Sequence, residues 1–387
     1  MASTADLGEI DALVVGAGPA GATVALNLAP LHRVMLVDRR SEPLPRIGES
    51  LPPAARRLLR DMGLWESFTR EGHSPCYGNR ATWGAEQAVE SDFLRDADGH
   101  GWHIDRARFE RWLRGIAEDR GAILVAAGRP QSIRWAGHRW RVRLAAPAGS
   151  LDVAVRLVID AGGRGAPMGR MLGASRRRHD KLVCRWLYGD ADPLGHGAGI
   201  TYVQAAENGW WYTAPLPGNR RVLAFHTDAD LTDAVPDADL PCAGARVRRE
   251  PAGLPALVQR AAPNSELAAI LAASRFTPTQ HCGVTAAHGA VLHPVAGPAW
   301  FAVGDAAFSC DPLSSQGLLN ALYTGLVAAE AADRTLSGNA GAVPEYVDTI
   351  GRVHATYREH LADCYRAETR WSNSPFWQRR HLASDDV

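Results

Sequence analysis

The sequence predicts a mixed α/β fold: a Rossmann-like unit at the N-terminus, a strand-rich region in the middle of the chain and a C-terminal helical segment. Three observations lead to this prediction. A glycine-rich turn joins a short apolar strand to a helix near the N-terminus, residues 182–230 hold strand-like segments separated by Gly, Asn and Pro turns, and residues 343–369 carry regularly spaced apolar side chains.

The N-terminal turn has the spacing of a dinucleotide clamp. Gly16, Gly18 and Gly21 stand between the apolar strand and a helix that begins at Pro19. The first glycine permits the tight turn, the second lets the backbone approach a pyrophosphate, and the third lets the helix pack on the strand. The helix N-terminus offers N–H groups to the phosphates. A second apolar strand ends in Asp38, where an acceptor for a ribose hydroxyl is expected.

Nicotinamide and flavin dinucleotides both use such a clamp, so other motifs must distinguish them. Residues 46–50 read RIGES and precede a helix predicted over residues 52–62. Gly48 permits a backbone close to a ring system, and Glu49 would place a carboxylate near the cofactor. A solvated loop acid is the alternative for Glu49.

Two further signals lie in the middle of the chain. Residues 105–120 form an amphipathic helix with Asp105 as its cap, and Arg106 in the first turn could reach a diphosphate or make a surface salt bridge. A strand over residues 155–159 then runs into the sequence DAGGR, which begins at Asp160.

The third motif is GDAAFSCDPLSSQG. A buried strand ends at Gly304 and Asp305, whose carboxylate can accept hydrogen bonds from a ribityl chain. The loop from Pro312 to Gly317 leads into an apolar helix over residues 318–332. The positive end of that helix dipole would face a reduced flavin ring, which carries negative charge.

GAGPAG, DAGGR and GDAA, in this order and at these separations, resemble the FAD-dependent aromatic hydroxylase superfamily, which has the para-hydroxybenzoate hydroxylase fold. RIGESLPP, GWWYTAP and DPLSSQGLLNAL are more similar to its flavin-dependent tryptophan halogenase branch. They are most similar to the non-halogenating members, such as the monooxygenases that hydroxylate a protein tryptophan during tryptophylquinone maturation. The similarity covers about residues 10–335.

The resemblance implies a Rossmann-like three-layer FAD domain interrupted by an inserted substrate domain, whose antiparallel sheet covers the flavin. We expect the FAD domain at 1–72, 100–180 and 283–335, the substrate domain at 73–99 and 181–282, and a C-terminal helical segment at 336–387. Non-covalent FAD is expected to be bound by Gly16, Gly18, Gly21, Asp38, Arg46, Ser50, Arg106, Asp160, Gly304, Asp305, Pro312, Gly317 and Leu318.

The middle motif departs from the Asp-Gly pair of the hydroxylases, because Ala161 follows Asp160. In the hydroxylases that pair helps a nicotinamide cofactor to approach. Two sources of electrons for the flavin therefore remain as alternatives: NAD(P)H acting directly, or a separate flavin reductase.

The sequence GWWYTAP occupies the position of the halogenases' Gly-Trp-x-Trp-x-Ile-Pro signature. Tyr212 and Ala214 replace Trp and Ile, which suits a larger space beside the flavin. We expect Trp210, Tyr212 and Glu49 at the catalytic site. Packing in the sheet core is the alternative for the two aromatic residues.

The chain has a single lysine, Lys181, and its other 41 basic residues among the 42 Lys and Arg are arginines. Halogenases of this branch need a lysine, roughly thirty residues after the Gly-Glu-Ser motif, to hold hypohalous acid. Arg80 stands in that neighbourhood. Arginine cannot readily release a proton, since its pKa is above about 12.

The leading expectation is an FAD-dependent monooxygenase that hydroxylates an indole-like aromatic ring, free or protein-borne, through a flavin C4a-hydroperoxide. Glu49 is the favoured general base, and the other candidates are His73, His103, His226 and His281. Three alternatives remain: an FAD-dependent reductase or dehydrogenase of an apolar isoprenoid-like substrate, a flavin-dependent halogenase, and a non-catalytic flavoprotein.

Composition limits the partners and the compartment. The formal net charge is zero, the pI is near 7.2 and 46% of residues are hydrophobic. This composition offers no excess of positive charge to bind nucleic acid. No apolar run is long enough to span a membrane, and no signal peptide is visible. Six cysteines lack metal-type spacing, with Cys310 interpreted as a small buried residue, so we expect no metal and a cytoplasmic location.

The last residues carry Trp371, Phe376 and Trp377 among polar neighbours. We expect these aromatic side chains to anchor the tail, with pocket closure or partner binding as the alternatives.

Overall fold

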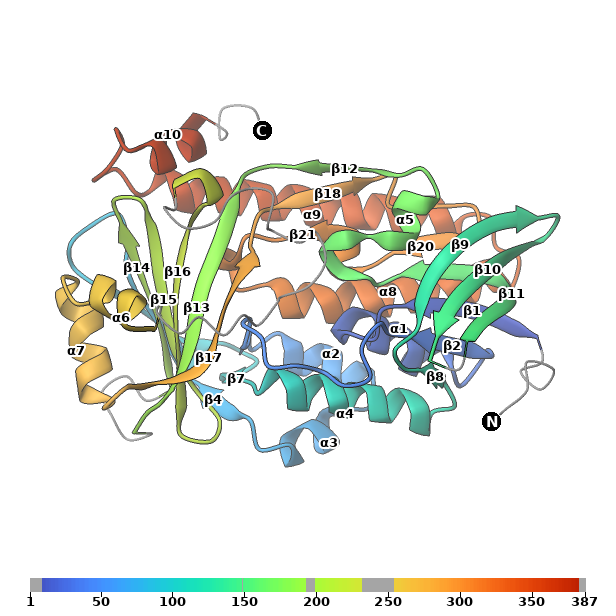
Figure 1. Ribbon diagram of the computed structural model, residues 1–387, viewed down its shortest axis with the longest axis horizontal. Helices are drawn as coiled ribbons and strands as arrows, with labels where there is room; N and C mark the ends of the chain where they lie inside the picture. The colour runs from blue at the N-terminus through green and yellow to red at the C-terminus, as the bar shows by residue number, and fades with distance from the viewer. Residues whose placement is uncertain (1–8, 148, 193–198, 232–253, 383–387) are drawn as a thin grey trace.

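The computed structural model describes residues 9–147, 149–192, 199–231 and 254–382. Figure 1 shows a parallel sheet with its helices beside a tall, mainly antiparallel sheet, and the long helix α9 (Ala342–Arg366) runs behind both. The predicted class, a mixed α/β fold with an antiparallel second sheet and a C-terminal helix, is confirmed.

The first sheet is built around β1 (Ile10–Val15), which pairs in parallel with β2 (Val34–Val37) and β11 (Gly149–Asp160). On either side it is extended in parallel by β8 (Ile123–Val125) and β20 (Trp300–Ala302). Because parallel strands point the same way, the motifs that follow β1, β2, β11 and β20 gather at one edge of the sheet. The remaining strands are β9 (Arg129–Ala136), β10 (Arg139–Ala146) and β19 (Ala296–Gly297).

Three helices pack against this sheet: α1 (Pro19–Leu28), α4 (Arg106–Asp119) and α8 (Gly317–Leu336). Helix α8 can approach α1 because Gly325 has no side chain, and a Cβ there would lie 2.7 Å from the carbonyl oxygen of Ala20. Asp105 caps α4 as predicted, since its carboxylate accepts a 3.0 Å hydrogen bond from the backbone N–H of Arg108.

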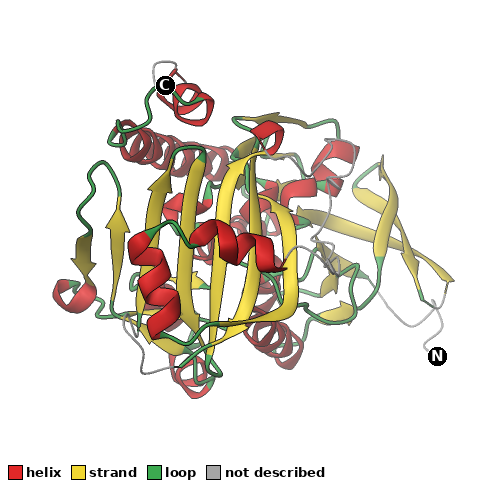
Figure 2. Ribbon diagram, turned by 60° about the vertical axis from the view of Figure 1, so that its left-hand side comes forward, coloured by secondary structure: helices red, strands yellow, loops and turns green. Residues whose placement is uncertain are grey.

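The second sheet faces the first across the site described below. Trp210 and Tyr212 lie on its inner face, and Trp211 lies on the outer face because side chains alternate along a strand. In Figure 2, two helices, α6 (Leu254–Ala261) and α7 (Ser265–Ala273), cover that outer face. In spatial order its strands are β17 (Thr277–Ala286), β13 (Leu182–Asp190), β16 (Arg220–Asp228), β15 (Gly209–Leu216), β14 (Ile200–Ala206), β5 (Gly78–Thr82) and β6 (Val89–Asp92).

This sheet draws on distant parts of the chain. Strand β5 pairs in parallel with β14, and the other neighbours pair antiparallel. Strand β17 belongs to the sheet over its whole length, and so continues through the boundary expected between residues 282 and 283.

Short helices and strands connect the two sheets. The helix predicted over residues 52–62 begins only at Ala55, because Pro53 disfavours helical geometry at Pro52. These connecting elements are α2 (Ala55–Asp61), α3 (Trp65–Arg70), α5 (Pro167–Met171), β3 (Ser50–Leu51), β4 (Ser74–Cys76), β7 (Gly101–His103), β12 (Ser175–Arg178), β18 (Ala290–His293) and β21 (Phe308–Ser309).

The C-terminal aromatic residues anchor the tail. Phe376 and Trp377 are fully buried at the start of α10 (Pro375–Leu382), and the indole N–H of Trp377 donates to the carbonyl of Ala206 at 3.0 Å. The alternative that Phe376 and Trp377 contact a partner is wrong, because their rings have no exposed surface. No helix among the described residues is long and apolar enough to cross a bilayer.

Candidate cofactor and active site

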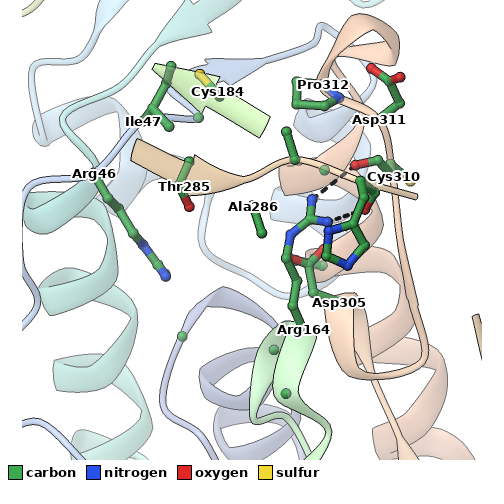
Figure 3. A pocket seen from close by; sticks show the side chains of 18 of the residues that line it. Arg46, Ile47, Arg164, Cys184, Thr285, Ala286, Asp305, Cys310, Asp311 and Pro312 are labelled. Carbon is green, nitrogen blue, oxygen red and sulfur yellow. Dashed lines mark hydrogen bonds and ion pairs between the residues drawn. The ribbon is translucent and has the colours of Figure 1, made fainter. Parts of the chain in front are cut away.

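A cavity of about 1810 Å³ lies between the two sheets. Its lining begins at the glycine clamp, passes the RIGES loop and the loop that follows β21, and ends at the aromatic inner face of the second sheet. Figure 3 shows Arg46 on one side of it and Arg164 with Asp305 on the other. This volume exceeds the roughly 300–1,000 Å³ of an ordinary small-molecule pocket, so it has room for a dinucleotide and a second molecule.

The glycine clamp has the geometry that the sequence predicts. A Cβ at Gly16, whose φ is +107°, would collide with the carbonyl of Ala161, and one at Gly21 would collide with the carbonyl of Gly16. Gly18 borders the cavity, and its nearest neighbour would be the Arg46 guanidinium at 3.6 Å from an added Cβ. Gly16 and Gly18 therefore line the cavity, while Gly21 serves the contact between helix and strand.

Asp38 also borders the cavity at the end of β2. Its carboxylate accepts the backbone N–H of Ala17 at 2.7 Å and pairs with Arg114 at 3.1 Å. These contacts hold the carboxylate beside the clamp, where its remaining lone pairs can accept a ribose hydroxyl.

Two arginines and one buried carboxylate stand at the phosphate side of the clamp. Arg46 and Arg106 both pair with Glu110, and Arg106 also donates to the carbonyl of Gly48 at 2.7 Å. Burial alone would raise the pKa of Glu110, but the two arginines lower it to about 2. The cluster keeps one net positive charge, and both arginines line the cavity.

The opposite wall holds Asp305. Its carboxylate lies 3.5 Å from Arg164, and its carbonyl accepts a 2.8 Å hydrogen bond from Arg176. Gly304 does not line the cavity; its φ is +54°, and a Cβ there would lie 2.8 Å from that of Ala20. Gly304 therefore brings the turn close to α1.

Asp160 lies below the cavity rather than in its wall. Its buried carboxylate accepts the backbone N–H groups of Gly162 at 2.9 Å and Gly169 at 2.8 Å, and burial raises its pKa to about 6. Asp160 thus shapes the loop, whereas its neighbours Ala161 and Gly162 line the cavity.

The segment 310–317 is here called the flavin loop. Its residues Pro312 and Gly317 line the cavity, as does Leu318, which follows the loop. A Cβ at Gly317 would meet nothing within 4 Å, so the N-terminus of α8 opens onto free space. Cys310 is buried, as interpreted from the sequence, and accepts a 3.1 Å hydrogen bond from Asn320. Burial raises the pKa of its thiol to about 12.

Glu49 is the buried acid of the site. It is 1% exposed and accepts a 2.6 Å hydrogen bond from Tyr188 and a 2.8 Å bond from the backbone N–H of Gly48. Burial raises the pKa of Glu49 in spite of these two donors. Ser50, the next residue, lies 3.2 Å from the hydroxyl of Tyr212.

The aromatic wall is formed by three side chains of the second sheet, Trp186, Trp210 and Tyr212. The ring of Trp210 stacks on His226 with centroids 3.6 Å apart and planes 7° apart. The indole N–H groups of Trp186 and Trp210 have no hydrogen-bond partner among the described residues, although both are buried. Burial lowers the pKa of His226 to about 3, so the stacked imidazole is neutral.

The remaining candidate bases lie outside the cavity wall. His73 and His103 are not lining residues, and His103 bonds Thr201 at 2.8 Å. His281 is exposed on β17. Ala214, expected to enlarge the space beside the flavin, is fully buried and does not line the cavity.

Neither Arg80 nor Lys181 lies where a halogenase lysine would be needed. Arg80 pairs with Glu266 at 2.5 Å outside the cavity. Lys181 lies on the rim of the cavity, exposed, and pairs with Asp230 at 2.9 Å.

Sequence reasoning missed Tyr188, Glu110, Arg114 and Trp186 as site residues. Tyr188 and Trp186 lie in a strand that the sequence does predict, but only the pairing of strands brings them to Glu49 and Trp210. Glu110 is four residues after Arg106 on an amphipathic helix, and this spacing is the one signal that could have found it.

Among the described residues, no cluster of three His, Cys, Asp or Glu side chains could hold a metal ion. The residues present do fit a flavin dinucleotide. The glycine turn, with two arginines beside it, suits the pyrophosphate, and the open N-terminus of α8 suits the flavin ring. Asp38 and Asp305 can accept hydroxyl groups of the ribose and of the ribityl chain. The site is therefore that of an FAD-dependent oxidoreductase.

The comparisons with known proteins agree. The chain belongs to the FAD binding domain family, whose profile its residues 9–250 match. It is 30% identical over 380 residues to LodB of Marinomonas mediterranea, a protein named as an FAD-dependent oxidoreductase, and the alignment covers 97% of each chain.

Two solved structures resemble the whole chain. The myxobacterial chondrochloren halogenase CndH has a TM-score of 0.83 at 23% identity, covering 96% of this chain and 85% of that one. The peptidyl tryptophan dihydroxylase QhpG has a TM-score of 0.73 at 25% identity, covering 96% and 78%. The resemblance to the hydroxylase superfamily and its halogenase-like branch, and the FAD cofactor, are confirmed.

Replacing Gly18 with Trp is expected to abolish FAD binding, because an indole would fill the space that the pyrophosphate needs. Gly351→Trp is the matched control, since Gly351 is exposed on α9 and has nothing within 4 Å of an added Cβ. Flavin content is measured by absorption after acid precipitation, which should leave the flavin in the supernatant. Normal content in Gly18→Trp, or flavin that stays on the polypeptide, would contradict the assignment.

Replacing Glu110 with Gln should lower the free energy of unfolding by about 2 kcal/mol at neutral pH, because two arginines lose their shared carboxylate. The folded-state pKa of about 2 lies below the ordinary 4.5, so Glu110 stabilises the fold above 4.5 and loses this effect as the pH falls toward 2. Thermal unfolding from neutral pH to about pH 3 should therefore be less pH-dependent in Glu110→Gln. Glu118→Gln, on the exposed face of the same helix, is the control, and equal behaviour of the two variants would refute the prediction.

Proposed function

We propose that this protein is an FAD-dependent monooxygenase that hydroxylates an electron-rich aromatic ring of the indole type. One observation carries the proposal: the cavity joins the FAD site to an aromatic wall with a buried carboxyl group, Glu49, between them. Bound reduced FAD would supply the chemistry that activates dioxygen.

The side chains divide the remaining work. Trp186, Trp210 and Tyr212 offer flat aromatic side chains on which an aromatic ring can stack. The two unpartnered indole N–H groups can donate to an acceptor on the substrate.

Glu49 is the group that can move a proton. Its carboxyl is buried, its pKa is raised by burial, and Tyr188 and Gly48 fix its orientation. A base with a pKa nearer to neutrality transfers protons more effectively at physiological pH, so Glu49 suits the loss of a ring proton as oxygen is added.

Halogenation is the less favoured alternative. A haloamine-type mechanism needs an amine inside the cavity beside the substrate, and the one lysine of the chain is exposed on the rim and paired with Asp230. The nearest sequence candidate, Arg80, lies outside the cavity.

The shape of the cavity supports a substrate carried on a polypeptide. A small aromatic metabolite is usually enclosed on about 70–90% of its surface, in a pocket of a few hundred cubic ångströms. The cavity of about 1810 Å³ includes the space for FAD, and its rim carries the exposed residues Met171, Arg178 and Lys181, so it opens to solvent instead of enclosing its contents. QhpG, by its name, acts on a peptidyl tryptophan.

Incubation with reduced FAD, ¹⁸O₂ and tryptophan-containing peptides or free indoles should give a product heavier by one labelled oxygen. Glu49→Gln should lower the rate about a hundredfold, because general base catalysis contributes about 10²–10⁴-fold. Its control is Glu90→Gln, an exposed carboxylate on β6. In the wild type the rate should fall on acidification through a pKa above the ordinary 4.5 of glutamate. Product that forms without oxygen would point to the reductase alternative and refute the proposal.

With reduced FAD, oxygen and bromide, we expect no protein-dependent bromination of indole or tryptophan derivatives, because the one lysine, Lys181, is exposed on the rim of the cavity and paired with Asp230. The measurement is mass spectrometry of the products, with boiled protein as the blank. Regioselective bromination that disappears in Lys181→Ala would overturn this expectation and assign the role to Lys181.

A further inference from the structure

Asp311, in the flavin loop, forms hydrogen bonds through both its backbone and its side chain. Its backbone N–H donates to the hydroxyl of Tyr357 at 2.7 Å, and its carboxylate accepts the hydroxyl of Tyr365 at 2.7 Å. The second carboxylate oxygen accepts the backbone N–H of Leu313 at 2.9 Å, which caps the short turn Pro312–Ser314. Asp311 is 1% exposed, so each of these bonds replaces a bond to water.

Both tyrosines belong to α9, outside the FAD-binding motifs. Tyr357 and Tyr365 are eight residues apart, and this spacing places them on one face of the helix. Each is buried, and each directs its only polar atom to the same loop residue. In Figure 3, Asp311 lies directly beside Pro312, which borders the cavity.

The same anchor continues to the second sheet. The guanidinium of Arg380, on α10, lies 5.1 Å from the ring of Tyr365 and pairs with Asp228 at 2.8 Å. Asp228 ends β16, two residues after His226, which stacks on Trp210 in the aromatic wall. A hydrogen bond, a cation–π contact and an ion pair therefore link the flavin loop, through the C-terminal helices, to the strand that carries His226.

We propose that Tyr357 and Tyr365 are positioning residues for the flavin ring, and that the C-terminal helical segment holds the flavin loop in its binding geometry through Asp311. The inference rests on the FAD site and on the assignment of the ring to the flavin loop, but it requires no particular substrate. A loop that is already ordered binds more tightly, because binding does not have to order it. Loss of either tyrosine hydroxyl frees one side of the loop.

The test compares Tyr357→Phe and Tyr365→Phe with Tyr346→Phe. Tyr346 is a matched control: it is buried on the same helix, and its hydroxyl donates to the carbonyl of Ala302 at 2.6 Å, in the sheet and away from the loop. Each phenylalanine removes one hydroxyl and one buried hydrogen bond. The dissociation constant of FAD is measured on apoprotein by quenching of flavin fluorescence, with the melting temperature of the apoprotein beside it.

We expect FAD to bind about tenfold more weakly to Tyr357→Phe and to Tyr365→Phe, and within about twofold of wild type to Tyr346→Phe, although all three apoproteins lose similar stability. The visible circular dichroism of bound FAD should change in the first two variants only. Tyr365→Phe combined with Asp311→Ala should bind FAD no more weakly than Asp311→Ala alone, since the alanine already removes the bond to Tyr365.

An unchanged dissociation constant in Tyr357→Phe and Tyr365→Phe would overturn the proposal, as would an equal loss in Tyr346→Phe. Should Tyr365→Phe fail to fold, Tyr357→Phe decides alone. All measurements are made without substrate and without oxygen turnover, so they remain informative even if the protein does not hydroxylate an aromatic ring.

Discussion

The site depends on one close backbone contact, at the point where the turn after β1 meets the end of β11. There is no room for a side chain at Gly16, because the carbonyl of Ala161 occupies the place of a Cβ, and Gly21 brings α1 against the same turn. This contact fixes the helix N-terminus relative to the middle of the sheet. The RIGES loop, Asp305 and the flavin loop are arranged around that fixed point.

Charge is distributed unevenly around the cavity, and the chemistry follows that distribution. The phosphate side has two arginines for one buried carboxylate, so it attracts an anion. The substrate side has aromatic rings and a neutral imidazole, with Glu49 as the buried acid between the two sides. The positively charged residues of the glycine clamp and the aromatic rings of the second sheet are thus separated within one cavity.

The cofactor half of the site could be predicted from the sequence, because its glycines, Asp38 and Asp305 sit in short motifs that local backbone geometry enforces. On the substrate side the sequence motifs also indicated Glu49, Trp210 and Tyr212, which line the cavity, but not the residues that these three contact. The approach of Tyr188 to Glu49 and the stacking of Trp210 on His226 depend on strand register between distant segments, which no local pattern encodes. Asp160 shows that a motif can indicate the right loop without giving the role of each side chain. The sequence predicts that it binds FAD, but its carboxylate accepts backbone N–H groups of the loop and does not line the cavity.

The strand order of the two sheets has a consequence for biosynthesis. The first sheet needs β20 at residues 300–302, and the second combines β5, near the N-terminus, with β17 at residues 277–286. The second sheet therefore cannot be complete until β17 has left the ribosome, and the first cannot be complete until β20 has. The edges of their partner strands stay unpaired until then, and such pairing between distant segments slows folding and favours aggregation.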